Sequence, residues 1–264
     1  MNSLQALFFG ILQGITEFLP VSSSGHLVVG RALMQIKDIP ILFDVMLHVS
    51  TLVVVVIVFR KRIGNLFLSL FRFIGRRNTD SDAVNLKLIV GIIAATVVTV
   101  VIGLGISVLE LETYPRIAAA FFLVTGIILI LARYAGGEKG YKELGIKEAL
   151  IAGLAQGFGV IPGVSRSGIT ISANLFAGLK REEAGEFSFL IAIPAILGAT
   201  ILEMRDFDAL LSAMNPVAVI VGIISSFVVG LVSLIVLLRL VKRGQLYIFS
   251  IYLLPLGITL LIIL

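Results

Sequence analysis

The 264-residue chain contains no cysteine and no tryptophan, and only 14% of its residues are charged. The absence of cysteine excludes disulfide bonds and thiolate chemistry. With 58% hydrophobic residues, the chain cannot bury its apolar surface in one soluble core. The sequence also lacks the short alternating segments of a transmembrane β-barrel. We therefore predict an all-α polytopic membrane protein, with residues 1–264 forming a single integral membrane domain.

Six apolar segments are long enough to cross a bilayer. Residues 60–82, which follow the first of them, are basic and partly amphipathic, so we expect a helix on the membrane surface there. Residues 136–145 form a polar linker between the two halves of the chain. The six membrane-spanning helices are predicted at residues 41–59, 84–108, 116–135, 184–204, 216–240 and 245–263.

Four other apolar segments are too short to cross. They occupy residues 3–19, 23–36, 147–161 and 164–178, and proline interrupts them after Leu19 and after Ile161. Short, broken helices with a counterpart in the other half indicate segments that enter the membrane and turn back. Irregular backbone at that depth is tolerated only inside protein or beside a wet cavity. We therefore expect two re-entrant helix pairs.

The two pairs are related by a duplication. Residues 6–25 align without gaps to residues 149–168, with roughly nine identities in about twenty positions. Each half contains one re-entrant pair and three crossings, and an odd number of crossings inverts the second half relative to the first. We expect an inverted-topology repeat, with units at about residues 1–135 and 147–264, whose two turns meet near the midplane.

Lysine and arginine indicate the orientation. Most of them lie on one predicted side, in residues 60–77, 133–147, 180–181 and 239–243. Basic loops remain in the cytoplasm, so both termini are expected on the outer side. Because these residues cluster at the ends of apolar segments, the net charge of +5 indicates topology, and we expect no nucleic acid partner.

The two turns have the composition of an anion site. Each is a run of serine and glycine before a helix, where backbone N–H groups, hydroxyls and the positive helix end can face an anion. Arg166 adds a guanidinium suited to phosphate. Close packing of helices by small residues would explain either turn alone. Two inverted copies with one arginine favour a bound phosphate.

Ionisable residues beside the first turn indicate chemistry. Glu17 lies at membrane depth, where a charged group is functional by default; Gln13 precedes it by one helical turn and His26 follows the turn. The structural alternatives are an ion pair of Glu17 with Arg166 and an interhelical hydrogen bond of His26. Asp44 and His48 share a face of the next helix, and either line the cavity or pair structurally.

A carboxylate, a hydroxyl, an imidazole and an arginine around an anion form a set suited to phosphoryl transfer. A hydroxyl or an imidazole is the nucleophile, and water completes hydrolysis. The residues alone do not choose between them.

Three motifs stand out in the chain: Gln13-x-x-x-Glu17, Pro20-Val21-Ser22-Ser23-Ser24-Gly25-His26 and Pro162-Gly163-Val164-Ser165-Arg166-Ser167-Gly168. They resemble the signatures of the undecaprenyl-pyrophosphate phosphatases, also called bacitracin-resistance proteins, and the similarity covers essentially the whole chain. The resemblance implies an enzyme of the bacterial inner membrane that converts undecaprenyl pyrophosphate into undecaprenyl phosphate and inorganic phosphate, recycling the lipid carrier of peptidoglycan synthesis. Its pocket would open to the outer, periplasmic side.

The resemblance also implies residue roles. The expected catalytic residues are Glu17, Ser23, His26 and Arg166, and a divalent cation, Mg²⁺ or Ca²⁺, is expected. Glu17 is the single candidate metal ligand, because Gln13 stands where many members carry Glu. Either Ser23 attacks after Glu17 takes its proton, with His26 assisting, or His26 attacks and Ser23 is a ligand. The expected substrate-binding residues are Gln13, Ser22, Ser24, Gly25, Ser165, Ser167 and Gly168.

A transporter or flippase of a phosphorylated polyprenyl lipid is the alternative function, because transporters also use inverted repeats with broken helices. Such a carrier needs no nucleophile. The expected partners are a polyprenyl pyrophosphate and membrane lipids, and the sequence does not decide between a monomer and a homodimer.

Overall fold

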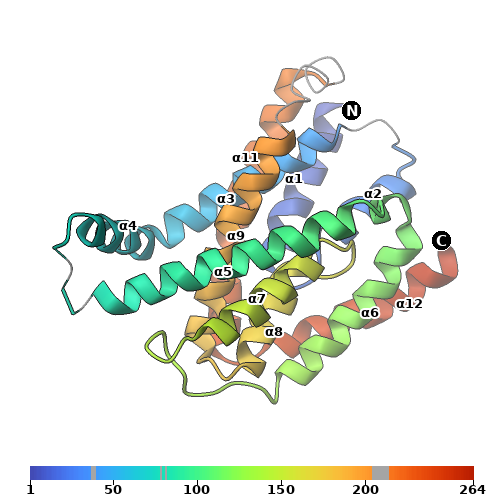
Figure 1. The fold of residues 1–264 in the computed structure, drawn as a ribbon. Coiled ribbons are helices and arrows are strands. Elements are labelled where there is room, and N and C mark those ends of the chain that lie inside the picture. Colours follow the sequence, from blue (N-terminus) through green and yellow to red (C-terminus); the bar gives the residue numbers. More distant parts are fainter. Residues whose placement is uncertain (37–39, 78, 81, 204–213) are drawn as a thin grey trace.

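The computed structural model describes residues 1–36, 40–77, 79–80, 82–203 and 214–264, and the predicted all-helical class is confirmed: these residues form helices and no strand (Figure 1). Within these described ranges, six helices are long and apolar enough to cross a membrane. They are α3 (Ile41–Val58), α5 (Asp82–Ser107), α6 (Pro115–Ala132), α9 (Arg181–Glu203), α11 (Pro216–Lys242) and α12 (Ser250–Ile263), the last extended at its start by the 3₁₀ turn η3 (Leu246–Phe249).

The six crossings follow the predicted order, with small differences at their ends. Helix α5 begins at Asp82, two residues before the predicted start, and α12 begins at Ser250 because residues 246–249 form the 3₁₀ turn. The predicted surface helix is α4 (Arg60–Ile74), on which Phe67, Phe71 and Ile74 are exposed. A second 3₁₀ turn, η1 (Leu111–Thr113), joins α5 to α6.

The four short helices are α1 (Ser3–Phe18), α2 (Ser23–Leu33), α7 (Ile146–Phe158) and α8 (Arg166–Phe176). Even α1, with 16 residues, is roughly 24 Å long, less than the hydrocarbon core. Serine starts the second helix of each pair, because the Ser22 and Ser165 hydroxyls accept hydrogen bonds from the N–H groups of Gly25 and Gly168. That each pair enters and leaves by one membrane face remains a prediction.

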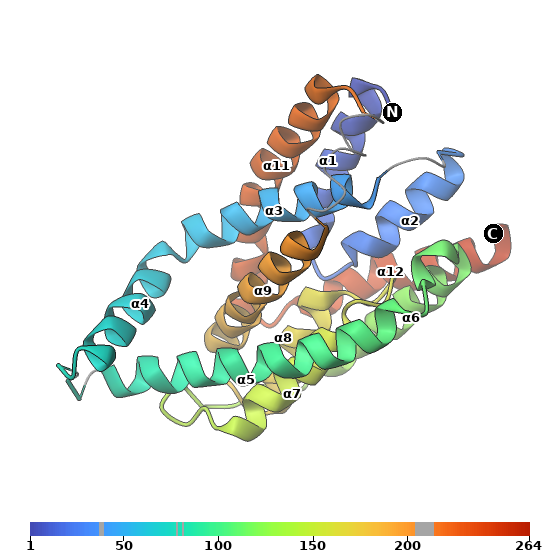
Figure 2. The same cartoon turned by 45° about the horizontal axis from the view of Figure 1, so that its top comes forward.

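The two halves place their short helices against equivalent partners. Helix α1 packs along α11, and α7 packs along α5 (Figures 1 and 2). The aligned glycines Gly10 and Gly153 allow both contacts, since an added Cβ would lie 2.4 Å from the Gly222 carbonyl oxygen and 2.5 Å from that of Ala95, respectively. In each half, the first short helix packs on the second long helix of the other half. This symmetry supports the duplication, although the repeat boundaries remain a prediction.

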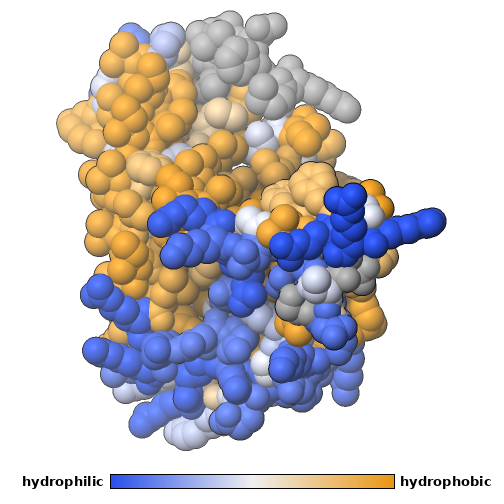
Figure 3. Space-filling view, turned by 90° about the vertical axis from the view of Figure 1, so that its left-hand side faces the viewer, coloured by the Kyte–Doolittle hydropathy of each residue, from blue (hydrophilic) through white to orange (hydrophobic). Residues whose placement is uncertain are grey.

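The surface separates an apolar belt from a basic end. Large hydrophobic residues such as Val97, Val101 and Ile224 are exposed on the long helices, as expected where lipid is the solvent. Figure 3 shows hydrophilic side chains gathered in the lower half of the face on the side of α4, with the apolar surface above them. Both termini lie away from α4 and from the linker between α6 and α7 (Figures 1 and 2).

Candidate active site

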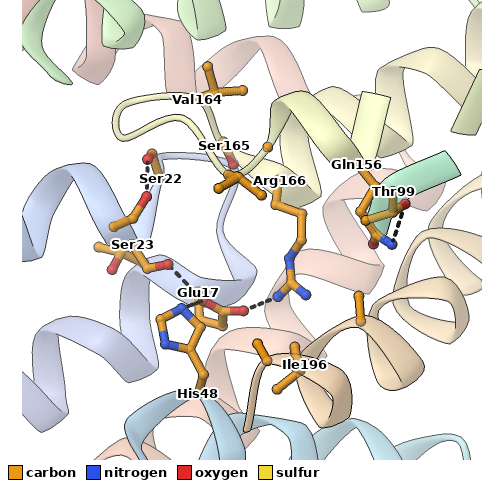
Figure 4. Close-up of a pocket in the computed structure, with 16 residues that line it drawn as sticks. Glu17, Ser22, Ser23, His48, Thr99, Gln156, Val164, Ser165, Arg166 and Ile196 are labelled. Carbon is orange, nitrogen blue, oxygen red and sulfur yellow. Dashed lines mark hydrogen bonds and ion pairs between the residues drawn. The ribbon is translucent and has the colours of Figure 1, made fainter. Parts of the chain in front are cut away.

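The two serine-rich turns line one cavity of about 220 Å³ (Figure 4). The turn between α1 and α2 contributes Ser22, Ser23 and Ser24, and the turn between α7 and α8 contributes Ser165 and Arg166. Helices α2 and α8 therefore both begin at the cavity, where their free N–H groups favour an anion. The remaining lining residues are Thr16, Glu17, His48, Thr99, Gln156, Gly159, Val160, Val164, Ala195, Ile196 and Ala199.

Hydrogen bonds join the two turns directly. The Ser22 hydroxyl accepts from the Gly163 N–H at 3.0 Å, and Ser167 donates to the Phe18 carbonyl at 3.0 Å. Ser22 has a φ of 69°, a strained value for a residue with a side chain. Gly25 is required at the contact, because a Cβ there would lie 2.7 Å from the Gly163 nitrogen. The predicted meeting of the two turns is confirmed.

Glu17 lies at the centre of the polar group (Figure 4). It stands on the last turn of α1, and its side chain is only 3% exposed. Its Oε2 accepts hydrogen bonds from the Ser23 hydroxyl at 2.7 Å and from the Gln13 amide at 3.1 Å. Its Oε1 forms an ion pair with Arg166, the first residue of α8. A carboxylate with these partners is oriented toward one hydroxyl and shielded from bulk water.

The other predicted site residues divide into two groups. Ser22, Ser24 and Ser165 line the cavity, whereas Gln13 lies behind Glu17 and is fully buried. The remaining three, Gly25, Ser167 and Gly168, are buried beside the cavity and are not among the residues that line it.

His26 is not brought into this group. Its Nδ1 lies 2.7 Å from the Ser22 carbonyl oxygen, and its Nε2 lies 2.8 Å from the Tyr252 hydroxyl of α12. A carbonyl can only accept, so Nδ1 carries the ring proton and Nε2 accepts from Tyr252. The ring also packs against Phe122, with 4.9 Å between centroids. This geometry corresponds to the structural alternative, an interhelical hydrogen bond.

His48 of α3 occupies the position expected for the imidazole. Its Nε2 lies 3.3 Å from Glu17 Oε2, and its ring lines the cavity. The sequence left His48 and Asp44 undecided. Asp44 pairs with Arg31 of α2 and is not among the lining residues. The sequence indicates a site role for His48 only weakly. His48 is one of two histidines in the chain, and it lies within a predicted membrane-spanning helix.

Two further lining residues come from the second half. Gln156 aligns with Gln13, and its amide donates to Thr99 Oγ1 at 3.2 Å and to the Ile191 carbonyl at 3.0 Å. Val160 stands where the first half has Glu17. The repeat therefore identifies Gln156 as equivalent to Gln13, although its hydrogen bonds go to other helices.

The residues present do not fit a divalent cation held by the protein. Among the described residues, no three His, Asp or Glu side chains form a potential metal-binding group. Both Glu17 oxygens already accept from Arg166, Ser23 and Gln13. Among the described residues, the unpartnered buried oxygens at or beside the cavity include Oε1 of Gln13 and Oε1 of Gln156, two neutral amide oxygens, whereas Mg²⁺ and Ca²⁺ take six or more oxygen ligands. A protein-bound metal at Glu17 therefore finds no support in this geometry.

The chain is similar to known proteins along almost its full length. A family model described as "Bacitracin resistance protein BacA" matches residues 6–259. Undecaprenyl-diphosphatase of Treponema denticola is 51% identical over 258 residues, which is 98% of this chain and 96% of that protein. The proteins of the same name from Desulfosudis oleivorans and Borreliella burgdorferi are 41% and 40% identical, each over 97% of this chain and over 97% and 96% of their own lengths.

Proposed function

Because the chain belongs to the bacitracin resistance protein BacA family, we propose that it is a membrane-embedded phosphatase that hydrolyses undecaprenyl pyrophosphate. The products are undecaprenyl phosphate and inorganic phosphate, so the lipid carrier of cell-wall synthesis is recycled. One observation carries this proposal: the Ser23 hydroxyl donates to the buried Glu17 carboxylate at 2.7 Å, in a cavity that also contains Arg166. A lipid transporter needs no such nucleophile.

The cavity suits a pyrophosphate group. Arg166 carries five N–H donors, and its ion pair with Glu17 involves Nη2, so other donors remain for phosphate oxygens. The N-termini of α2 and α8 add backbone N–H groups. The hydroxyls of Ser24 and Ser165 complete the set of donors along the same wall. These groups hold the negative charge that develops on the transferred phosphoryl group.

The geometry favours Ser23 as the nucleophile. Glu17 takes the Ser23 proton while Oγ attacks the terminal phosphorus, and water then hydrolyses the phosphoseryl intermediate. Gln13 and Arg166 keep the carboxylate oriented during this exchange. His26 acts as a positioning residue, because it joins the start of α2 to α12 through Ser22 and Tyr252. Both of its ring nitrogens are engaged in that link.

In this proposal, a divalent cation, Mg²⁺ or Ca²⁺, is bound to the pyrophosphate and comes into the cavity with it as part of the substrate. Phosphate oxygens and water supply the ligands, as Mg²⁺ prefers. The cavity needs no carboxylate cluster for that purpose, which agrees with its single glutamate.

We place the protein in the bacterial inner membrane with the cavity open to the outer, periplasmic side. Two features support this orientation. The basic stretches of residues 60–77 and 133–147 belong to α4 and to the linker between α6 and α7, and basic segments mark the cytoplasmic side. Figure 3 shows hydrophilic side chains gathered in the lower half of the face on the side of α4. Both termini lie away from α4 and from that linker (Figure 1).

Phosphate release from a polyprenyl pyrophosphate by the purified protein tests the function. We expect release by the unchanged protein and a loss of about 100-fold or more in Ser23→Ala, Glu17→Ala and Arg166→Ala. Ser107→Ala and Arg133→Ala, which change exposed residues outside the cavity, serve as matched controls. Unchanged release in the Glu17 and Arg166 variants would remove the site assignment, and lipid transport without phosphate release would support the transporter.

A further inference from the structure

The proposed reaction leaves one ionisable group of the cavity without a role. His48 reaches Glu17 from α3, with 3.3 Å between Nε2 and Oε2 (Figure 4). Its side chain is 28% exposed, whereas that of Glu17 is 3% exposed. His48 therefore lies between the buried carboxylate and the open part of the cavity, where it can contact a bound molecule.

The second nitrogen of the His48 ring determines which protons the ring holds. Nδ1 lies 2.8 Å from the backbone carbonyl oxygen of Asp44. A carbonyl oxygen only accepts hydrogen bonds, so Nδ1 carries a proton. A neutral imidazole has one N–H group, and its Nε2 would then present a lone pair to the Glu17 carboxylate. That contact becomes attractive only when a second proton lies between Nε2 and Oε2.

The neighbours of Glu17 place this proton on His48. Oε1 of Glu17 is paired with the Arg166 guanidinium, and Oε2 already accepts from Ser23 and Gln13. Two neutral donors and the Arg166 cation stabilise the ionised carboxylate, so a proton shared between Glu17 and His48 lies on Nε2 of the ring.

The other charged groups near His48 do not change the preference for a proton on its Nε2. They are Asp44 on the same helix and its partner Arg31 on α2, which form an ion pair with each other. Glu17 of α1 and Arg166 of α8 form the second pair. With its second proton, the His48 ring adds one positive charge beside the Glu17–Arg166 pair of the cavity, and this charge favours an anionic substrate.

We propose that His48 is the general acid and base of phosphoryl transfer, an inference that rests on the proposed phosphatase function. In the first step, the bond from Ser23 Oγ to the terminal phosphorus forms and the bond from that phosphorus to the bridging oxygen breaks. The Ser23 proton goes to Glu17, and the Nε2 proton of His48 goes to the bridging oxygen. The lipid monophosphate leaves, and His48 is neutral.

The second step reverses both proton transfers. Water attacks the phosphorus of the phosphoseryl group and gives a proton to His48 Nε2. The bond from phosphorus to Oγ breaks, and Oγ takes its proton back from Glu17. Inorganic phosphate leaves, and the imidazolium, the carboxylate and the serine hydroxyl are restored. One water is consumed for each pyrophosphate, so atoms and charges balance.

Replacement of His48 by glutamine tests the proposal, because glutamine can donate a hydrogen bond to Glu17 and cannot release a proton. We expect kcat on a polyprenyl pyrophosphate to fall about 100- to 1,000-fold, with a much smaller change in KM. The acid must carry its proton, so the rate of the unchanged protein should fall at alkaline pH. His48→Gln loses this alkaline limb.

His26→Gln is the matched control, because His26 has the same Nδ1 contact and a hydroxyl as its other partner. This variant loses activity as the link between α2 and α12 weakens, and it keeps the alkaline limb. A lipid-tailed 4-nitrophenyl phosphate provides a second readout. Its nitrophenolate leaving group needs no proton in the first step, so the single-turnover rate of leaving-group release should fall at least tenfold less in His48→Gln on this substrate than on the pyrophosphate.

Two outcomes would overturn the role of His48. One is an alkaline limb that persists in His48→Gln, and the other is an equal loss of the single-turnover rate of leaving-group release on both substrates. If His48→Gln fails to fold in a thermal melt, the unchanged protein decides, since only the pyrophosphate reaction should show the alkaline limb. Release by the unchanged protein together with its loss in Arg166→Ala keeps the phosphatase proposal intact whatever the His48 result.

Discussion

His26 and His48, the two histidines of the chain, have the same local geometry and different partners. In each, Nδ1 meets the backbone carbonyl four residues earlier, at 2.7 Å for His26 and 2.8 Å for His48. Nε2 of His26 faces the Tyr252 hydroxyl, whereas Nε2 of His48 faces the Glu17 carboxylate. A hydroxyl can donate and a carboxylate cannot, so Nε2 of His26 can accept from its partner, whereas Nε2 of His48 forms a hydrogen bond with Glu17 only when it carries a proton.

The two turns differ in the same way. Both begin a helix with a serine whose hydroxyl accepts from a glycine N–H three residues later. The first turn follows Glu17 and contains Ser23, whereas the aligned positions of the second are Val160 and Arg166. Two turns with equivalent serine caps therefore supply a carboxylate and a hydroxyl from one side and a cation from the other. For the two histidines and for the two turns, the backbone contacts are alike, and the side chains that face each other determine which groups donate, accept or carry charge.

The largest expected effect comes from Glu17→Gln, which removes the carboxylate opposite His48. We expect phosphate release to fall about 1,000-fold or more, because Ser23 loses its base and Arg166 loses its ionic partner. With an amide in place of the carboxylate, His48 also loses the charged acceptor that favours a proton on its Nε2. Histidine ring nitrogen signals in NMR spectra measure the second effect.

Glu138→Gln changes an exposed linker residue and is the control for Glu17→Gln. A His48 ring that stays doubly protonated in Glu17→Gln would show that Glu17 is not the cause of the difference between the two histidines.

The second-largest loss of activity is expected for Gly25→Ala. This substitution moves the helix that carries His26 without changing either histidine. The added Cβ would lie 2.7 Å from both the Gly163 nitrogen and the Phe122 ring. We expect a loss of stability of about 1–3 kcal/mol from overpacking and a loss of activity as the two turns separate.

Gly105→Ala is the control for Gly25→Ala, because nothing lies within 4 Å of a Cβ at that position. Thermal melting and phosphate release measure both variants. Full activity in Gly25→Ala would mean that the contact between the turns is not needed.

A smaller effect is expected for Tyr252→Phe, which removes the hydrogen bond to His26 Nε2. One lost hydrogen bond with a buried partner costs about 1–3 kcal/mol, and activity should fall less than tenfold. The pH profile should keep its shape, because His26 does not transfer a proton in the proposed reaction. Tyr134→Phe, at an exposed tyrosine, is the control. A changed alkaline limb in Tyr252→Phe would assign that limb to His26.

The smallest effect is expected when Mg²⁺ or Ca²⁺ is added to the protein without substrate. Calorimetric titration of Mg²⁺ or Ca²⁺ should show no tight site, because Glu17 is the single carboxylate lining the described cavity and its oxygens are already occupied. Addition of pyrophosphate should produce binding of the metal complex. Tight metal binding by the substrate-free protein, abolished by Glu17→Gln, would contradict the proposed entry of the metal with the substrate.

Particular residues show how far sequence reasoning reached. Glu17 and Arg166, 149 positions apart, were expected to share a site because the alignment of the two turns implies an inverted repeat, and the structure pairs them. His26 was expected there because it follows the first turn closely. One helical turn along α2 was enough to direct its ring toward Tyr252, which no short-range pattern reveals. His48 lies on another helix, and its approach to Glu17 depends on how α3 packs.

The sequence by itself determined the helical class, the six crossings and the two broken pairs, because the thickness of the bilayer sets the length of an apolar helix and proline ends it. It also determined that two serine-rich turns correspond to each other. Only the tertiary structure decided which imidazole faces the carboxylate and how the oxygens of Glu17 are occupied. These features depend on contacts between helices distant in sequence. A shift of a few ångströms between such helices can place a hydrogen-bond donor where an acceptor would otherwise lie.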